Sequence, residues 1–220
     1  MRSSPSLGAT EPSLRMSSDL VIGQDGVARC PWGASPPEYQ AYHDNEWGLP
    51  VSNDNRVFEK LCLEGFQAGL SWLTILRKRE AFRRAFASFD PRLVARFDDA
   101  DITRLLGDPG IIRHRGKIVA TIANAQATVR LAEQGVRLAA FVWSYEPGAR
   151  PAPKTLSDLP ASTAESKALS AELRRQGFRF VGPTTAYAAM QSLGLVNDHL
   201  KGCHSRAITG SARANFDVPV

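Results

Sequence analysis

Cysteine is scarce in this chain of 220 residues, with only three, so a framework of disulfide bonds is excluded as its main source of stability. An uncharged apolar run of roughly 18 residues, the length needed to cross a membrane, is also missing. The N-terminal residues lack the apolar segment of a signal peptide, because serine, proline and charged residues interrupt them throughout. With thiols that stay reduced, these absences predict a cytoplasmic protein with no membrane contact.

Strand patterns, in which apolar and polar residues alternate, are scarce, and neither internal repeats nor low-complexity blocks are evident. The composition of 43% hydrophobic and 22% charged residues is ordinary for a globular protein and excludes a fully disordered chain. The length allows one substantial domain or two small ones. A formal net charge of +5 is compatible with an anionic partner such as nucleic acid, but many enzymes with this charge have no such partner.

Both ends of the chain differ from its middle. Residues 1–28 are rich in serine, proline and glycine and show no apolar period, which predicts a disordered extension. Residues 206–220 look similar and are predicted to form a flexible tail. The folded domain is therefore expected to span residues 29–205. Nothing in it indicates an obligate dimer, so we expect a monomer.

The middle of the chain is predicted to be helical, and the fold class to be all-α. Apolar residues from Phe58 to Leu76 recur at helical spacing, which predicts one long, central helix with Asp54 as its N-cap. Residues 136–145 fit a helix or a strand, and the spacing of their apolar residues favours a helix. Further helices are predicted near residues 91–106, 113–133, 163–176 and 184–194.

Four residues of the kinds that bind zinc lie in two pairs at opposite ends of the predicted domain. Cys30 and His43 form the first pair, and His199 and Cys203 form the second. The members of the second pair are four residues apart, so they share a face if the segment is helical. Zinc favours four such ligands in structural sites. The alternative is a coincidence of buried thiols and surface imidazoles, and His204 is a second candidate for the place of Cys203.

Glu64 is the one carboxylate in the apolar stretch 61–76. A carboxylate in a helix that is buried nearly all round costs free energy unless it is paired or hydrogen-bonded. One interpretation is a buried ion pair with an arginine. The other is the wall of a pocket, where Glu64 accepts hydrogen bonds from a ligand that carries an amine.

Aromatic residues are concentrated near the first zinc-type pair and near Glu64. Flat faces combined with one hydrogen-bond acceptor are what a planar nitrogenous base requires. Aromatic side chains more often simply build the core, so this pattern alone does not decide between the two interpretations. The residues are Trp32, Tyr39, Tyr42, Trp47 and Trp72.

Two glycine-containing segments could contact phosphate. Residues 177–185 join two predicted helices, and their glycines and the N–H groups of the following helix could hold a phosphate or could form an ordinary turn. Residues 110–117 form the densest basic patch around a helix start, where His114 lies between two arginines. This patch is either a phosphate contact or a solvated surface.

Along the chain, these segments resemble the 3-methyladenine DNA glycosylase I family of helix-hairpin-helix DNA glycosylases. The resemblance extends from about residue 29 to residue 203, and motifs of this length are highly specific. The matching stretches are residues 29–32 (RCPW), 42–48 (YHDNEWG), 61–65 (LCLEG), 67–72 (QAGLSW), 110–118 (GIIRHRGKI), 177–178 (GF), 180–182 (FVG) and 194–199 (GLVNDH).

The resemblance implies a helix-hairpin-helix glycosylase fold in which a structural zinc ion joins the two ends of the domain. The implied zinc ligands are Cys30, His43, His199 and Cys203. The implied contacts to the DNA backbone are Gly177, Phe178, Arg179, Gly182 and Thr184. The implied base pocket, with Glu64 as the catalytic residue, comprises Glu64, Tyr42, Trp72, Tyr39 and Trp32. Pro183 is tolerated at the start of a helix, but it lacks an N–H group that could bind phosphate.

The implied activity is hydrolytic release of 3-methyladenine from alkylated duplex DNA, a step of base-excision repair. The enzyme is expected to lack lyase activity, because Lys201 follows the last motif rather than lying within it. Asp198 follows the hairpin, as a catalytic aspartate does in many related glycosylases, but a helix cap or a contact behind His199 is the expected role. One rival hypothesis is a zinc-stabilised module that binds DNA without cleaving it. The other is a zinc hydrolase, but four protein ligands would leave no coordination position for a catalytic water.

Overall fold

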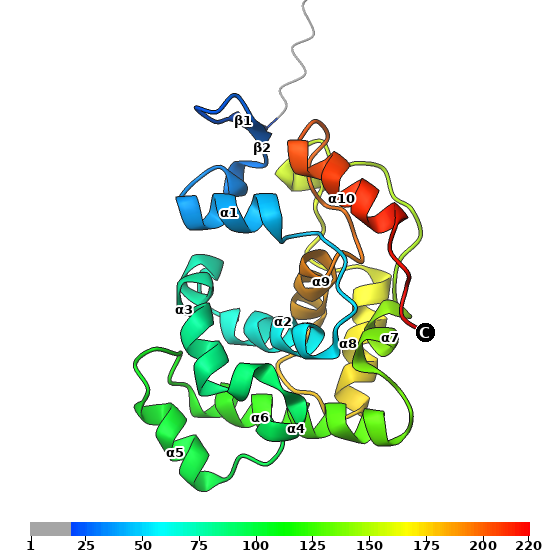
Figure 1. Cartoon of the computed structure of the whole chain (residues 1–220). Helices are drawn as coiled ribbons and strands as arrows, with labels where there is room; N and C mark the ends of the chain where they lie inside the picture. Colours follow the sequence, from blue (N-terminus) through cyan, green and yellow to red (C-terminus); the bar gives the residue numbers. More distant parts are fainter. Residues whose placement is uncertain (1–18) are drawn as a thin grey trace, which may run out of the picture.

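The computed structural model describes residues 19–220, and this part of the chain folds mainly into helices, so the all-α prediction is confirmed (Figure 1). The α-helices are α1 (Pro37–Asn45), α2 (Asp54–Gln67), α3 (Trp72–Ala85), α4 (Pro91–Val94), α5 (Asp99–Gly107), α6 (Arg115–Glu133), α7 (Leu138–Trp143), α8 (Ala164–Arg175), α9 (Pro183–Ser192) and α10 (His204–Ala214). Short 3₁₀ helices are η1 (Pro31–Gly33), η2 (Ala87–Phe89) and η3 (Leu156–Asp158). None of the helices in the described residues is both long and apolar enough to cross a membrane.

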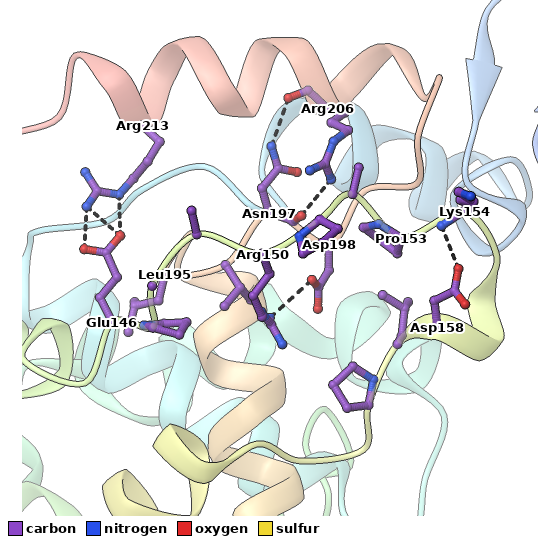
Figure 2. A pocket seen from close by; sticks show the side chains of 18 residues that line it. Glu146, Arg150, Pro153, Lys154, Asp158, Leu195, Asn197, Asp198, Arg206 and Arg213 are labelled. Carbon is purple, nitrogen blue, oxygen red and sulfur yellow. Dashed lines mark hydrogen bonds and ion pairs between the residues drawn. The ribbon is translucent and has the colours of Figure 1, made fainter.

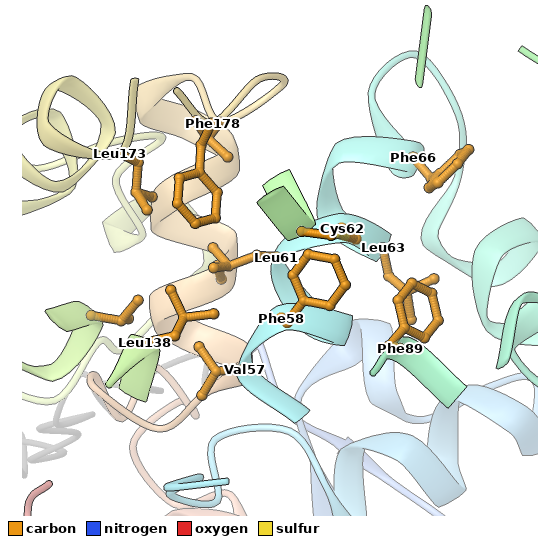
Figure 3. Packing of buried hydrophobic residues seen from close by; sticks show 14 of the residues in the cluster. Val57, Phe58, Leu61, Cys62, Leu63, Phe66, Phe89, Leu138, Leu173 and Phe178 are labelled. Atoms are coloured by element: carbon orange, nitrogen blue, oxygen red, sulfur yellow. The ribbon is translucent and has the colours of Figure 1, made fainter. Parts of the chain in front are cut away.

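Helix α2 lies at the centre of the fold and packs against α3, α6, α7 and α9. Every residue from Val57 to Phe66 is buried. Figure 3 shows Val57, Phe58 and Leu61 of this helix among side chains from the surrounding helices. Burying each large apolar side chain contributes about 1.5 to 3 kcal/mol. A functional group on α2 is therefore held on a rigid element.

The single long helix predicted over residues 58–76 is wrong, because the chain breaks between α2 and α3. Gly69 lies in the break with φ +81°, a left-handed conformation that no α-helix can continue through. The apolar spacing persists across the break because both helices face the same core, so periodicity alone could not reveal it. The N-cap of α2 is Asn53 rather than Asp54, since the Asn53 side chain accepts a hydrogen bond from the Arg56 N–H at 3.1 Å.

Side chains fix both ends of this break. Lys117, on α6, donates from Nζ to the carbonyl oxygens of Phe66 at 2.8 Å and Ala68 at 2.6 Å. These carbonyls end α2 and have no helical partner of their own. Ser71 starts α3 by accepting from the Thr74 N–H at 3.3 Å. The break therefore has a defined geometry, and it places Trp72 at the first position of α3.

Most of the other predicted helices are present. Helices α6, α7, α8 and α9 match the predicted segments to within two residues at each end. The segment 91–106 instead forms α4 and α5, because Asp98 leaves the helical conformation and caps α5 by accepting from the N–H groups of Ala100 and Asp101. Helix α1 was not predicted, since its sequence PEYQAYHDN has no apolar stripe.

The N-terminal and C-terminal parts of the described chain contact each other, which corrects both predicted tails. The flexible tail predicted over residues 206–220 is wrong up to residue 214, because α10 is a helix whose Arg213 pairs with Glu146 and lies 5.0 Å from the Trp143 ring centre. Strands β1 (Val21–Ile22) and β2 (Ala28–Arg29) form an antiparallel hairpin, and β2 contacts α10. The predicted extension is thus folded from β1 onward, and its residues 1–18 lie outside the described residues.

Candidate active site and metal centre

An open cavity of about 310 Å³ is lined mainly by residues of η1, α1, α2, α3 and α9. All five residues predicted to line a base pocket contribute to its wall. The volume is at the small end of the range for ligand pockets, which suits a single planar ring system. The lining residues are Trp32, Tyr39, Tyr42, Trp47, Glu64, Gln67, Trp72, Leu159, Ala188 and Gln191.

The aromatic rings of the cavity are fixed by contacts with one another. The ring centres of Tyr42 and Trp72 are 5.4 Å apart, and those of Trp32 and Tyr39 are 6.0 Å apart in an edge-to-face arrangement. The Tyr39 hydroxyl accepts from the Leu73 N–H at 2.9 Å, which holds the first turn of α3 against α1. The Trp72 Nε1–H group is buried and has no partner among the described residues, so it is a donor available to a ligand.

Glu64 is 6% exposed and has no arginine partner among residues 19–220, so the structure does not support a buried ion pair with arginine. Burial raises the pKa of Glu64 to about 7, although the charge of Lys60 and the Ser192 hydroxyl act in the opposite direction. Lys60 itself pairs with Glu46, with 2.9 Å between Nζ and Oε1. Near neutral pH, Glu64 is therefore poised between its two protonation states and favours a positively charged neighbour.

A second carboxylate, the half-buried Glu46, pairs with cations that lie near the Tyr42 ring. It accepts from Lys60 at 2.9 Å and from Arg79 at 2.6 Å, and both cations lie within 6.0 Å of the centre of the Tyr42 ring. Burial, followed by the charges of Glu64 and Glu46, raises the pKa of Tyr42 well above its usual value. Tyr42 therefore keeps its hydroxyl proton and can donate it in a hydrogen bond.

The sequence analysis did not predict several residues of this site. Gln67 and Gln191 line the cavity, but amides carry no charge or spacing pattern that would distinguish them. Lys60 was hidden in the apolar run of α2, where a buried lysine could have indicated an acid nearby. Trp47 was noted among the aromatic residues but was not assigned to the pocket.

The four predicted zinc ligands come together in one buried cluster, with their ligand atoms within 4.8 Å of one another. His43 Nε2 lies 3.2 Å from His199 Nδ1, and Cys203 Sγ lies 3.4 Å from His43 Nε2 and 3.8 Å from His199 Nδ1. Cys30 Sγ lies 3.9 Å from His199 Nδ1. Ligands around a tetrahedral zinc ion are separated by about 3.3 to 3.8 Å, given its usual bond lengths. The cluster therefore fits a metal ion of this size.

The imidazole rings are oriented as metal ligands require. His43 contacts Asp44 through Nδ1 at 2.8 Å, and His199 contacts the Trp47 carbonyl through Nε2 at 3.1 Å. These contacts leave Nε2 of His43 and Nδ1 of His199 facing the thiols. His204 is not part of the cluster, because its Nε2 lies 2.8 Å from Asp44 instead.

The two thiols of the cluster interact with each other. Their mutual influence lowers the pKa of Cys203 and raises that of Cys30. The third cysteine, Cys62, is a buried core residue on α2. The cluster thus contains a ready anionic ligand and a second thiol that a metal ion would deprotonate.

The predicted hairpin is the turn between α8 and α9. Gly177 has φ +99°, and Gly182 is the residue before the first turn of α9. Asn124 of α6 holds the backbone of Arg179 through two hydrogen bonds. Its side chain accepts from the Arg179 N–H at 2.7 Å and donates to the Arg179 carbonyl at 3.2 Å. The Arg179 and Thr184 side chains are exposed, whereas Phe178 is a core residue. The turn is thus rigid, with N–H groups of α9 facing outward.

The remaining candidates have structural partners. His114 caps α6 by accepting from the Lys117 N–H at 3.2 Å, and the residue is exposed. Asp198 is 7% exposed and accepts from the Tyr187 hydroxyl at 2.5 Å and from Gln191 Nε2 at 2.9 Å. It does not line the aromatic cavity.

A larger cavity of about 760 Å³ lies under residues 146–160 (Figure 2). Its charged side chains pair mainly with one another: Arg213 with Glu146, and Arg150 with Asp198 at 3.6 Å. Leu159 lines this cavity and the aromatic one. Asp198 lines the larger cavity and bonds Gln191, which lines the aromatic one.

An aromatic cavity with a buried carboxylate in its wall has the chemistry that a planar nitrogenous ring requires of its binding site. The sequence profile of the methyladenine glycosylase family matches residues 32–207. DNA-3-methyladenine glycosylase 1 of Escherichia coli (strain K12) is 51% identical over 180 residues, which cover 80% of this chain and 96% of that protein. The chain belongs to the methyladenine glycosylase family.

Further relatives agree with this assignment. A DNA-3-methyladenine glycosylase of Haemophilus influenzae is 46% identical over 180 residues, covering 80% of this chain and 97% of that protein. A crystal structure of a 3-methyladenine DNA glycosylase I superposes with a TM-score of 0.78 at 49% identity, covering 80% of this chain and 98% of the other. A structure of the Staphylococcus aureus enzyme that addresses 3-methyladenine recognition superposes with a TM-score of 0.77 at 37% identity. The match covers 81% of this chain and 96% of the other.

Proposed function

We propose that this protein is a DNA glycosylase that releases 3-methyladenine from alkylated duplex DNA by hydrolysing the bond between the base and deoxyribose. The observation that carries the proposal is Glu64, a buried carboxylate without an ion-pair partner among residues 19–220, in the wall of an aromatic cavity. A protein that only binds DNA has no need of such a group. The names of the relatives support the same activity.

The chemistry requires little acid catalysis from the protein. Methylation at N3 makes adenine cationic, so the base is already a good leaving group when water attacks the sugar. The protein must flip the base out of the helix, which costs a few kcal/mol, and recover that free energy in the cavity. Trp72 stacks on the cationic ring, a contact that contributes about 0.5 to 2 kcal/mol.

Glu64 recognises the base and balances its charge. Its carboxylate accepts a hydrogen bond from the exocyclic amine, and the positive charge of the base stabilises the ionised form of Glu64. Tyr42 donates a hydrogen bond that orients the ring, and Trp32 and Tyr39 complete the wall. Neutral adenine lacks the charge that the aromatic faces and the carboxylate favour, so selectivity follows from charge and shape together.

The turn between α8 and α9 holds the DNA backbone in this proposal. Gly177, Phe178, Arg179, Gly182 and Thr184 shape the turn or face a phosphate. The N–H groups of the first turn of α9 have no helical acceptors, which supports phosphate binding there. Pro183 contributes none, so Thr184 supplies the first donor of the helix. These contacts do not read sequence, as a repair enzyme requires.

The Cys30, His43, His199 and Cys203 cluster holds a structural zinc ion in this proposal. Two thiolates and two imidazoles are a zinc-type ligand set, and four protein ligands leave no position for a catalytic water. The ion joins β2 and α1 to the segment before α10, which ties the ends of a monomeric domain together. A zinc hydrolase is not favoured for the same reason.

Product analysis tests the proposed activity. The wild-type protein, loaded with zinc, is incubated with methylated duplex DNA, and the released bases are separated by chromatography. We expect 3-methyladenine in the supernatant and 7-methylguanine left in the DNA. Abasic DNA should stay intact, because the described wall of the cavity contains no lysine that could act as a lyase nucleophile. Tight binding to methylated DNA without release of any base would support the rival DNA-binding module.

A further inference from the structure

Gln191 lies in the cavity wall, one turn after Ala188 on the same face of α9. The next residue, Ser192, is the α9 residue that acts on Glu64. Gln191 and Glu64, the carboxylate proposed to bind the base, thus line the same cavity. Nothing in the proposed chemistry so far uses it.

The orientation of the Gln191 amide is fixed by Asp198. Nε2 donates to Asp198 Oδ2 at 2.9 Å, and a carboxylate only accepts, so the NH₂ group must face it. The carbonyl oxygen of a planar amide then faces away from Asp198. It has no hydrogen-bond partner among the described residues and is not among their fully buried unpartnered atoms, so it is open to a donor, and Gln191 itself lines the cavity.

Asp198 is itself held by two further side chains, Tyr187 and Arg150. The Tyr187 hydroxyl donates to Asp198 Oδ2 at 2.5 Å and accepts from Arg150 at 3.0 Å. Arg150 also lies 3.6 Å from Asp198 Oδ1 (Figure 2). Burial, and then the hydrogen bond to Asp198, raises the pKa of Tyr187 to about 12, so this hydroxyl stays a donor. The whole chain of contacts prevents the Gln191 amide from turning over.

We propose that Gln191 determines specificity by presenting its carbonyl oxygen to the base as a second acceptor beside Glu64, and that Asp198 is the positioning residue that holds it. An exocyclic amine has two N–H groups, and the two acceptors take one each. A base with a carbonyl at the same position meets two acceptors and leaves both unpaired. The inference rests on the proposed function, because it concerns the same cavity.

The affinities of two free bases test this inference. 3-Methyladenine carries the amine, and 3-methylhypoxanthine carries an oxygen in its place. Gln191→Met keeps the length of the side chain but removes the acceptor. We expect this variant to bind 3-methyladenine about tenfold more weakly, and to bind 3-methylhypoxanthine as tightly as the wild type or more tightly. Calorimetry on the full, zinc-loaded chain gives both dissociation constants. Gln126→Met, the same change on the exposed face of α6, is the matched control and should change neither.

Asp198→Asn tests the positioning role. The variant allows the Gln191 amide to turn over, so the preference for 3-methyladenine should fall several-fold. In a Gln191→Met background the same change should have no further effect on this preference, because its target is gone. Zinc content is measured for each variant, since Asp198 precedes His199. If Asp198→Asn loses zinc, Gln191→Met and a second variant, Gln191→Leu, still decide the matter.

The outcomes separate the two proposals. If the wild type binds 3-methyladenine but Gln191→Met binds both bases as the wild type does, or loses both equally, the specificity role is wrong and the glycosylase proposal stands. If the folded wild type neither binds nor releases 3-methyladenine, the proposed function fails and takes this inference with it.

Discussion

The Sγ atom of Cys30 lies 3.9 Å from Nδ1 of His199, although 169 residues separate them in the chain. The same cluster contains His43 and Cys203, so one metal ion there would join the first and last parts of the domain. Because the ligands gather only in the folded state, a metal ion bound there would stabilise the fold.

We therefore expect about one zinc ion per chain, and Cys203→Ala should lose most of it. The variant should also lose about 3 kcal/mol or more of unfolding free energy, measured in urea. Cys62→Ala is the matched control, because this thiol is buried outside the cluster. This variant should lose stability only through the lost packing of the side chain, and it should keep its zinc. A protein that folds equally well with and without a chelator, and never holds metal, would contradict the structural role.

Glu64 should make stability depend on pH. Its folded pKa, raised to about 7, exceeds the ordinary value of 4.5, so the folded state binds more protons between these values and stability falls as pH rises through this window. Glu64→Gln removes this cost. The free energy of unfolding of the variant, taken relative to that of wild type, should be about 2 to 3 kcal/mol higher at pH 8 than at pH 5. Urea unfolding at both pH values measures the difference, and an equal effect at both would show that burial does not perturb Glu64.

The sequence indicated the site better than it indicated the helices around it. Long motifs predicted Glu64 and four zinc-type ligands, and the structure has Glu64 in the wall of a cavity and the four ligands in one cluster. The break at Gly69 was missed, since α2 and α3 continue one apolar pattern and the residue that stabilises the break, Lys117, lies far along the chain. Helix α10 was missed because its largely polar sequence resembles that of a flexible tail. Its ion pair between Arg213 and Glu146 joins residues far apart in the chain, which the sequence does not reveal.

Lys117→Met should loosen the break between α2 and α3. The substitution leaves the Phe66 and Ala68 carbonyls without their donor, which costs about 1 to 3 kcal/mol. The effect should also lower base affinity, because Trp72 begins the next helix. Lys78→Met is a matched control, since Lys78 also donates to two backbone carbonyls but in a less buried position. Its cost in urea unfolding should be smaller, and equal costs would mean that the break does not depend on Lys117.

Asn124→Ala should separate DNA binding from base binding. The change removes both hydrogen bonds that hold the Arg179 peptide in the turn between α8 and α9. We expect affinity for duplex DNA to fall several-fold, by fluorescence anisotropy, while affinity for free 3-methyladenine stays the same. Thr128→Val is the control, because its hydroxyl bonds only within α6. Equal loss of both affinities in the Asn124 variant would indicate general damage instead of a role in the turn.

The most direct test of the account is the rate of base release from methylated duplex DNA under single-turnover conditions, for wild type and Glu64→Gln. The variant keeps the shape of the cavity but cannot carry the negative charge that balances the base. We expect wild type to release 3-methyladenine, and the variant to do so about 100-fold more slowly while unfolding at a higher urea concentration at pH 8. Release at the wild-type rate by the variant, or none by folded, zinc-loaded wild type, would contradict the central role given to this carboxylate.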